Sequence, residues 1–152
     1  MSQLTAGTPA PDFTLTDQHG ETVSLGDFAG RKVLVFFYPK ADTPGCTSQA
    51  CGLRDVADEL GDTVVVGISP DLPPKLEKFD TKHDLGFTLL SDPEHAVAEA
   101  FGVWGEKKLY GKVYMGIVRS SFLIDEQGHL EQVWYKISPK DTPKKLLAAL
   151  EG

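Results

Sequence analysis

The chain has 152 residues, a length that fits one domain, and we expect residues 1–152 to form it. A core of this size needs neither a disulfide nor a metal for stability. Hydrophobic residues make up 41% of the chain and charged residues 24%, proportions typical of a globular protein. The net charge of −7 argues against a nucleic-acid partner and against an anionic membrane surface, because both attract basic patches.

The chain contains two cysteines, Cys46 and Cys51. Two are too few for a disulfide-stapled secreted scaffold or for a zinc site built from cysteines alone. Residues 1–7 lack the charged and apolar regions of a signal peptide, and no apolar run is long enough to predict a membrane span. We therefore expect a cytoplasmic protein. In that reducing compartment a close pair of thiols is more often reactive or metal-binding than structural.

The N-terminal part of the chain predicts a hairpin followed by a buried strand. Short strands are expected at residues 12–16 and 21–25, because turn-forming residues 17–20 separate them. Residues 33–38 are continuously apolar and predict a central strand buried on both faces. Pro39 ends this strand, since proline cannot donate to the strand ladder.

A helix is expected directly after this strand. Thr43 is a suitable N-cap, Pro44 fits the first helical position, and Gly61 is placed to end the helix. Apolar side chains then recur at helical spacing and predict the buried face of the helix. This stripe consists of Ala50, Leu53, Val56, Ala57 and Leu60.

The rest of the chain alternates between strands and helices and ends in a hairpin and a helix. Residues 105–112 are interpreted as a polar loop that lacks the glycine and lysine pattern of a phosphate loop. The whole order predicts an α/β protein with a thioredoxin-like fold: a central mixed sheet flanked by helices, with an N-terminal β-hairpin extension. The remaining expected elements are strands at 63–68, 87–90, 121–124 and 130–134, and helices at 73–85, from 92 to about 101, and from Thr142-Pro143 onward.

Cys46 falls in the first turn of the helix that Thr43 begins. Free backbone N–H groups and the positive end of the helix dipole favour the thiolate there, and the thiolate is the nucleophilic form of cysteine. The placement therefore indicates a reactive cysteine. The alternative is a small buried core residue, because Cys46 shares the apolar stripe of Ala50 and Leu53.

Cys51 makes the reactive interpretation stronger. Five residues along a helix place the two Cα atoms about 8.7 Å apart, whereas a disulfide needs a separation below about 7 Å. The pair therefore either never bonds or bonds only when the first helical turns unwind, and Gly52 weakens the helix there by about 1 kcal/mol relative to alanine. The C-x-x-x-x-C spacing suits the resolution of a sulfenic acid better than the rapid disulfide exchange of a C-x-x-C motif.

Residues 39–47, Pro-Lys-Ala-Asp-Thr-Pro-Gly-Cys-Thr, resemble the P-x-x-x-T-x-x-C signature of the peroxiredoxins. With residues 49–55, Gln-Ala-Cys-Gly-Leu-Arg-Asp, the sequence looks like the Q class, also called the bacterioferritin comigratory protein type. The resemblance covers about residues 7–150, and its supporting blocks are residues 7–13, 101–107 and 116–125.

This resemblance implies a thioredoxin-dependent thiol peroxidase. Cys46 would be the peroxidatic nucleophile, and Cys51 the resolving cysteine that forms an intramolecular disulfide with it. Thr43, Arg119 and Pro39 match the motif positions that complete the active site. The Arg119 cation would favour the thiolate, the Thr43 hydroxyl and the Cys46 N–H would hold the peroxide, and Pro39 would shield the sulfur. Thr43 is then expected both to cap the helix and to bind substrate.

The implied substrates are hydrogen peroxide and organic hydroperoxides, and the implied reductant is thioredoxin or a similar dithiol protein, in antioxidant defence. No cofactor and no metal is implied, and we expect a monomer or a weak homodimer. A disulfide reductase on the same fold and a copper-binding assembly protein are the alternatives, although the latter usually has closer cysteines and a membrane anchor. Other conspicuous residues are interpreted as surface residues (His19, His83, His95, His129) or as packing residues (Trp104, Trp134).

Overall fold

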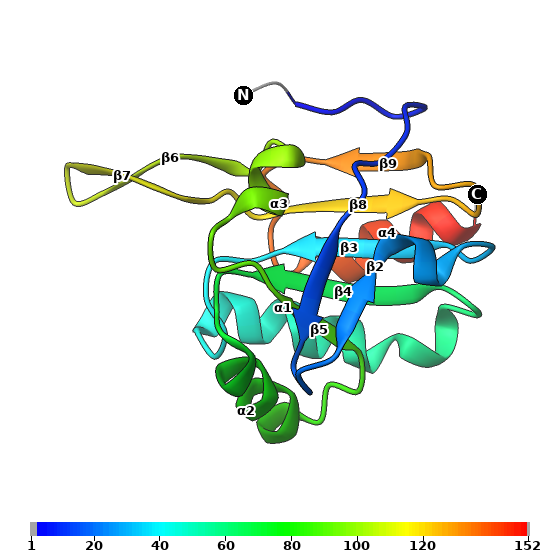
Figure 1. Ribbon diagram of the computed structural model, residues 1–152, viewed down its shortest axis with the longest axis horizontal. Coiled ribbons are helices and arrows are strands. Elements are labelled where there is room, and N and C mark those ends of the chain that lie inside the picture. Colours follow the sequence, from blue (N-terminus) through cyan, green and yellow to red (C-terminus); the bar gives the residue numbers. More distant parts are fainter. Residues whose placement is uncertain (1–2, 152) are drawn as a thin grey trace.

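The computed structural model describes residues 3–151 and contains strands and helices in alternation (Figure 1). The helices are α1 (Pro44–Asp55), α2 (Pro73–His83), α3 (Ala96–Ala100) and α4 (Asp141–Glu151), with short 3-10 turns at Leu25–Phe28 and Ala57–Glu59. The strands are β1 (Thr14–Asp17), β2 (Thr22–Ser24), β3 (Val33–Phe37), β4 (Val64–Ser69), β5 (Thr88–Ser91), β6 (Trp104–Leu109), β7 (Lys112–Ile117), β8 (Ser120–Ile124) and β9 (Leu130–Trp134).

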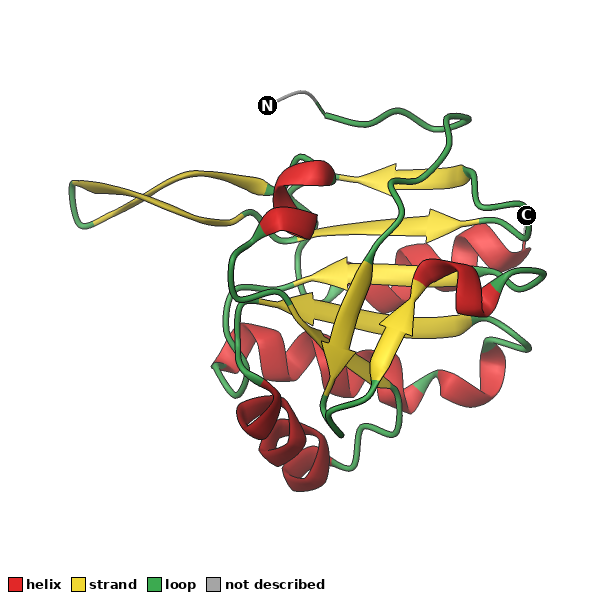
Figure 2. Ribbon diagram, in the orientation of Figure 1, coloured by secondary structure: helices red, strands yellow, loops and turns green. Residues whose placement is uncertain are grey.

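Seven of these strands form one mixed sheet in the order β2-β1-β5-β4-β3-β8-β9. Strands β3, β4 and β5 are parallel, as expected for strands joined by helical crossovers. Strand β8 runs antiparallel to β3, and the hairpins β8-β9 and β1-β2 form the two edges of the sheet. Helices lie on both sides of the sheet (Figure 2), so the predicted fold class, a thioredoxin-like mixed sheet flanked by helices, is confirmed.

Strand β3 is buried along its whole length, as its apolar sequence predicted. Because successive side chains of a strand point to opposite faces, β3 contributes to two apolar clusters, one on each side of the sheet. Val33, Val35 and Phe37 pack with α3, whereas the alternate side chains pack with α1, α2 and α4. The face that carries α1 is therefore the face on which both cysteines lie.

Several predicted helix boundaries are wrong, each for a local reason. Helix α1 ends at Asp55, not at Gly61, because the chain tightens into a 3-10 turn in which Ala57 is exposed and leaves the predicted stripe. Helix α2 ends at His83, since the next residue adopts a left-handed conformation. Asp92 does not begin α3; its carboxylate accepts hydrogen bonds from backbone N–H groups inside the helix.

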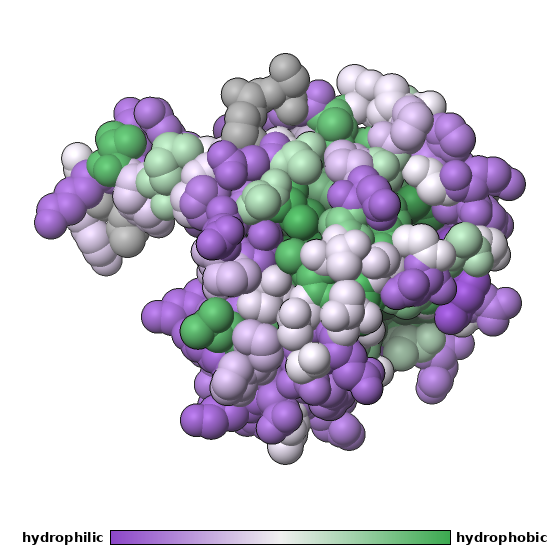
Figure 3. Space-filling view, viewed as in Figure 1, coloured by the Kyte–Doolittle hydropathy of each residue, from purple (hydrophilic) through white to green (hydrophobic). Residues whose placement is uncertain are grey.

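The predicted loop at residues 105–112 is also wrong, because this segment belongs to the ribbon β6-β7. Tyr110 and Gly111 both have positive φ, as a two-residue hairpin turn requires. The ribbon projects from the body of the protein (Figure 1 and Figure 3). Val113 and Met115 are exposed on it. Neither face of the ribbon is packed on the core over most of its length, so the sequence lacks the alternation of apolar and polar residues that marks a half-buried strand.

The burial of the tryptophans follows the sequence prediction, whereas the burial of two histidines does not. Trp104 and Trp134 pack against the two apolar clusters, as predicted. His83 and His95, which we expected at the surface, are half-buried: His95 stacks on Trp104 with ring centroids 3.8 Å apart, and His83 pairs with Asp42. Within the part of the chain that the structure describes, no helix is long and apolar enough to cross a membrane.

Candidate active site

Strand topology brings Arg119 to the helix that carries the cysteines. Phe37, at the end of β3, pairs with Ser120, the first residue of the antiparallel strand β8. The residue before β8 therefore lies next to the loop after β3, at the same end of these two paired strands. The Arg119 backbone is fixed there, since its carbonyl accepts a 3.0 Å hydrogen bond from Ile137 N–H.

Thr43 occupies the N-cap position of α1, as predicted, but its side chain makes no capping hydrogen bond. Its hydroxyl instead donates to the carbonyl of Lys40 at 2.8 Å. Because the hydroxyl proton points to this carbonyl, the oxygen lone pairs are available to another donor. The expected competition between capping and substrate binding is thus absent from the observed hydrogen bonds of this threonine.

Cys46 lies in the first turn of α1 and is 1% exposed. The helical ladder begins with the hydrogen bond from Thr47 N–H to Thr43 O, so the Cys46 N–H precedes the ladder and has no partner within the helix. Arg119 Nη2 lies 3.4 Å from the Cys46 sulfur. The sulfur therefore meets a fixed cation and the positive end of the helix, and both favour negative charge on it.

Gln49 holds the guanidinium group of Arg119 in this position. It is fully buried, and its Oε1 accepts a hydrogen bond from Arg119 Nη1 at 2.8 Å. Gln49 stands on the buried face of α1 one turn after Cys46, so the helix that carries the sulfur also orients the cation beside it. The sequence interpretation gave Gln49 no role. A glutamine in an otherwise apolar helical stripe was the available signal.

The loop between β3 and α1 is tied to β4 and α2. Ala41 N–H donates to Asp71 Oδ2 at 2.7 Å, just beyond the end of β4. Asp42 has a left-handed backbone and forms ion pairs with Lys82 at 2.9 Å and His83 at 3.1 Å. Hydrogen bonds from these two partners lower the pKa of Asp42. The loop in front of Cys46 is therefore held from two sides.

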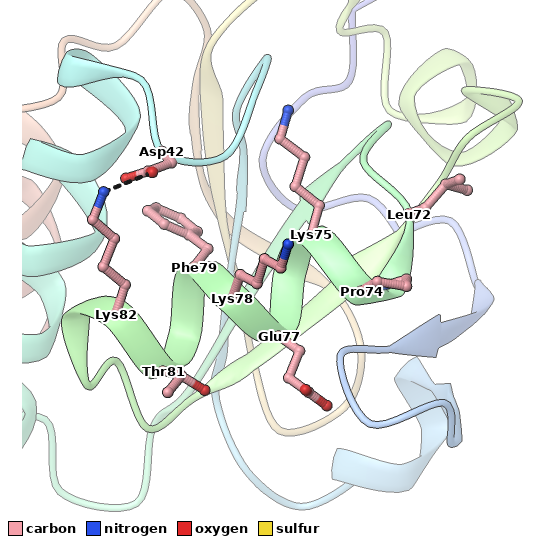
Figure 4. Close-up of a pocket in the computed structure, with 9 residues that line it drawn as sticks. All are labelled: Asp42, Leu72, Pro74, Lys75, Glu77, Lys78, Phe79, Thr81 and Lys82. Atoms are coloured by element: carbon pink, nitrogen blue, oxygen red, sulfur yellow. Dashed lines mark hydrogen bonds and ion pairs between the residues drawn. The ribbon is translucent and has the colours of Figure 1, made fainter.

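Asp42 also borders a groove of about 960 Å³ along α2, which lies outside the site (Figure 4). Leu72 and Phe79 are among the apolar residues that line it, and Lys82 reaches Asp42 across one end. Neither cysteine nor Arg119 belongs to its lining, so this groove is not where the sulfur would meet a substrate.

Tyr38, the last buried residue before Pro39, lies in the same apolar cluster as Cys46. Within residues 3–151 its buried hydroxyl has no hydrogen-bond partner. Burial raises the pKa of Tyr38 far above its usual value, so the phenol stays neutral. Pro39 follows it at the end of β3 and is half-buried.

Lys107 adds a second cation near the site. It extends from β6 and donates to the carbonyl of Ile117 at 2.9 Å. Burial, and then repulsion by Arg119, lower the pKa of Lys107, whereas negative charge on the Cys46 sulfur acts in the opposite direction. The ribbon that the sequence interpretation took for a loop thus contributes charge to the surroundings of the sulfur.

Cys51 lies on the same helix as Cys46, is half-buried, and both thiols are free. Helix α1 is continuous from Pro44 to Asp55, so both cysteines lie in regular helix, as the spacing argument requires of the unbonded pair. Gly52, predicted to weaken the helix, also allows Pro143 of α4 to lie close to α1, because a Cβ at position 52 would be only 3.0 Å from Pro143 Cγ. Among residues 3–151, no three His, Cys, Asp or Glu side chains are grouped so that they could hold a metal.

The chain matches known proteins of one family over most of its length. Residues 6–133 match the model of the AhpC/TSA family. A putative peroxiredoxin Bcp of Haemophilus influenzae is 59% identical over 100% of this chain and 99% of its own, and the peroxiredoxin Bcp of Escherichia coli is 60% identical over 88% and 87%.

A solved structure of the bacterioferritin comigratory protein of Xanthomonas campestris, studied for its alkyl peroxide reduction activity, superposes with a TM-score of 0.88. It is 31% identical to this chain and covers 97% of this chain and 98% of its own. Sequence and structure therefore match the same class of proteins over nearly the whole length. The chain belongs to the AhpC/TSA family and is a peroxiredoxin of the Bcp class.

Proposed function

We propose that the chain reduces hydrogen peroxide and organic hydroperoxides with Cys46 as the nucleophile and Cys51 as the resolving thiol. A thioredoxin-like dithiol protein in the cytoplasm would recycle the disulfide, and residues 1–152 would act as one domain, as a monomer or a weak homodimer. The observation that carries the proposal is the buried Cys46 sulfur at the start of α1, 3.4 Å from the Arg119 guanidinium. Its peroxidase relatives support the same chemistry.

In the first step the Cys46 thiolate attacks one oxygen of the peroxide. The S–O bond forms as the O–O bond breaks, and the leaving oxygen departs as an alkoxide or hydroxide that takes up a proton. Arg119 and the Cys46 N–H can stabilise the charge that moves to the leaving oxygen. The Thr43 hydroxyl, whose proton goes to the Lys40 carbonyl, can accept a hydrogen bond from the protonated oxygen of the peroxide. Cys46 becomes a sulfenic acid, and Pro39 would limit its contact with water.

In the second step the Cys51 sulfur attacks the sulfenic acid and water leaves. Because the intact helix holds the two Cα atoms about 8.7 Å apart, the first turns of α1 must unwind before this disulfide can form. An external dithiol then reduces the disulfide to two thiols, and α1 can form again.

The burial of Cys46 favours a peroxidase over a disulfide reductase. A disulfide reductase must bring its sulfur against a sulfur of another protein, which requires an exposed nucleophile. Cys46 is 1% exposed, so access is easier for a small peroxide than for a protein disulfide. Peroxide reduction should therefore far exceed insulin reduction by the same preparation.

The test is peroxide consumption with a thioredoxin and thioredoxin reductase system. Cys46→Ser should abolish turnover, and undiminished activity would refute the assignment of the nucleophile. Cys51→Ser should complete one turnover and leave a sulfenic acid on Cys46 that dimedone traps, as mass spectrometry can show. Full multiple turnover of this second variant with thioredoxin would show that Cys51 is not the required resolving thiol.

A further inference from the structure

We propose that Thr142, at the start of α4, is a positioning residue for the reaction of Cys46; this inference rests on the proposed function of that cysteine. Thr142 is fully buried and does not touch the sulfur. Its hydroxyl begins a chain of hydrogen bonds that ends at the sulfur. The chain passes from Thr142 to Gln49 (2.9 Å), from Gln49 to Arg119 (2.8 Å) and from Arg119 to Cys46 (3.4 Å).

The direction of each hydrogen bond follows from the atoms present. The Thr142 hydroxyl donates its one proton to the carbonyl of Ser138 at 3.0 Å, so towards Gln49 it can only accept. Gln49 must therefore turn its NH₂ group to Thr142, and its carbonyl oxygen then faces Arg119. A guanidinium group is a donor only, so the opposite amide orientation would place two donors against each other. Thr142 thus selects the amide orientation that Arg119 needs.

The backbone around Thr142 holds this arrangement in place. Positions 45, 49 and 52 lie on one face of α1, and all three face the segment 139–143. A Cβ on Gly45 would lie 3.6 Å from Pro139, and one on Gly52 would lie 3.0 Å from Pro143. The start of α4 is therefore packed along the turns of α1 that carry both cysteines, and Gln49 is buried between them.

Without the Thr142 hydroxyl, the Gln49 amide loses the acceptor that anchors its NH₂ end. The NH₂ group would be buried without a partner, and the amide could rotate to present it elsewhere, which costs Arg119 its acceptor. The guanidinium would then leave its position beside the Cys46 sulfur. We therefore expect that loss of the Thr142 hydroxyl, which lies on another helix, lowers the reactivity of Cys46.

The experiment uses the full chain with Cys51→Ser, so that only the first step is observed. Thr142→Val keeps the branched shape but removes the hydroxyl, and Thr142→Ser keeps the hydroxyl. Leu146→Val is the matched control, because Leu146 is also fully buried on α4, one turn later, and lies outside the hydrogen-bond chain. Two rates are measured: oxidation of Cys46 by hydrogen peroxide in a single turnover, and alkylation of Cys46 by iodoacetamide at neutral pH.

Thr142→Val should lower both rates roughly tenfold, the effect of one lost buried hydrogen bond, whereas Thr142→Ser should retain them within about twofold. Leu146→Val should lower the thermal unfolding midpoint and leave both rates unchanged. Parental rates in Thr142→Val, the same loss in Leu146→Val, or a failure of serine to restore the rates would overturn the proposal. If the parent does not react with peroxide, the proposed function fails, and the alkylation rates alone decide the role of Thr142.

Discussion

Replacement of Gly45 by alanine separates the stability of α1 from the reactivity of Cys46. Gly45 is the second residue of α1, and its φ is not positive, so alanine can adopt its backbone conformation. Alanine is favoured over glycine in a helix by up to about 1 kcal/mol. The added Cβ, however, would lie 3.2 Å from Arg119 Nη2, closer than an ordinary van der Waals contact. Arg119 must therefore move by a few tenths of an ångström.

This movement weakens the contact between Arg119 and Cys46. A hydrogen bond to a charged group contributes about 1.5–3 kcal/mol, so the loss of half of it slows the reaction about fivefold. We therefore expect Gly45→Ala to be at least as stable as the wild type in urea unfolding and about fivefold slower in single-turnover oxidation by hydrogen peroxide.

The matched control for this prediction is Gly26→Ala. The φ of Gly26 is not positive either, and among the described residues no atom beyond its two chain neighbours lies within 4 Å of its Cβ position. This variant should keep the wild-type peroxide rate. An undiminished rate in Gly45→Ala would refute the argument that the position of Arg119 controls the sulfur, and a large loss of stability would refute the packing argument.

Three further predictions concern the surroundings of the site. Tyr38→Phe should leave the free energy of unfolding unchanged or raise it by about 1 kcal/mol, because it removes a buried hydroxyl without a partner; a clear loss of stability would show that this hydroxyl is bonded. Gly67→Ala should destabilise the protein by about 1–3 kcal/mol in urea unfolding, since its Cβ would lie 2.8 Å from Phe36 and 3.0 Å from Tyr38, both fully buried; wild-type stability would contradict this packing. The ion pairs of Asp42 lower its pKa, so their contribution to stability is complete above the usual value of 3.8 and is lost as the pH falls below it. Asp42→Asn should therefore be less stable than wild type at pH 6, with a difference that shrinks in acid; a difference independent of pH would refute the assignment.

The elements that the sequence predicted well are those with a strong local pattern. The apolar run at β3 is buried as expected, and Thr43 and Pro44 begin α1 as expected. The end of α1 was placed too late, because the apolar residues that follow Asp55 continue the pattern although the chain has left the regular helix. The ribbon β6-β7 was missed because its pairing is not accompanied by burial of one face, so no period of two appears in its sequence.

The features of the site also differ in whether the local sequence predicts them. The placement of Cys46 in the first helical turn, the spacing to Cys51 and the resemblance to the peroxiredoxins could be recognised in the sequence, because they depend on residues within one short segment. Arg119 could be named only through that resemblance, since 73 residues separate it from Cys46. Only the antiparallel pairing of β8 with β3 places it beside the sulfur.

The hydrogen bonds that orient Arg119 depend on tertiary structure throughout. Gln49 and Thr142 are separated by 93 residues, and each is an ordinary polar residue in its local sequence. Their partnership arises because α4 packs along the face of α1 that carries the cysteines, where a buried polar group must find a partner. By itself, the sequence determined the class of protein and the start of the helix that carries both cysteines, and it predicted Cys46 as the nucleophile. The tertiary structure decided which cation faces the sulfur and which side chains hold it, because contacts between distant segments leave no periodic signal in the chain.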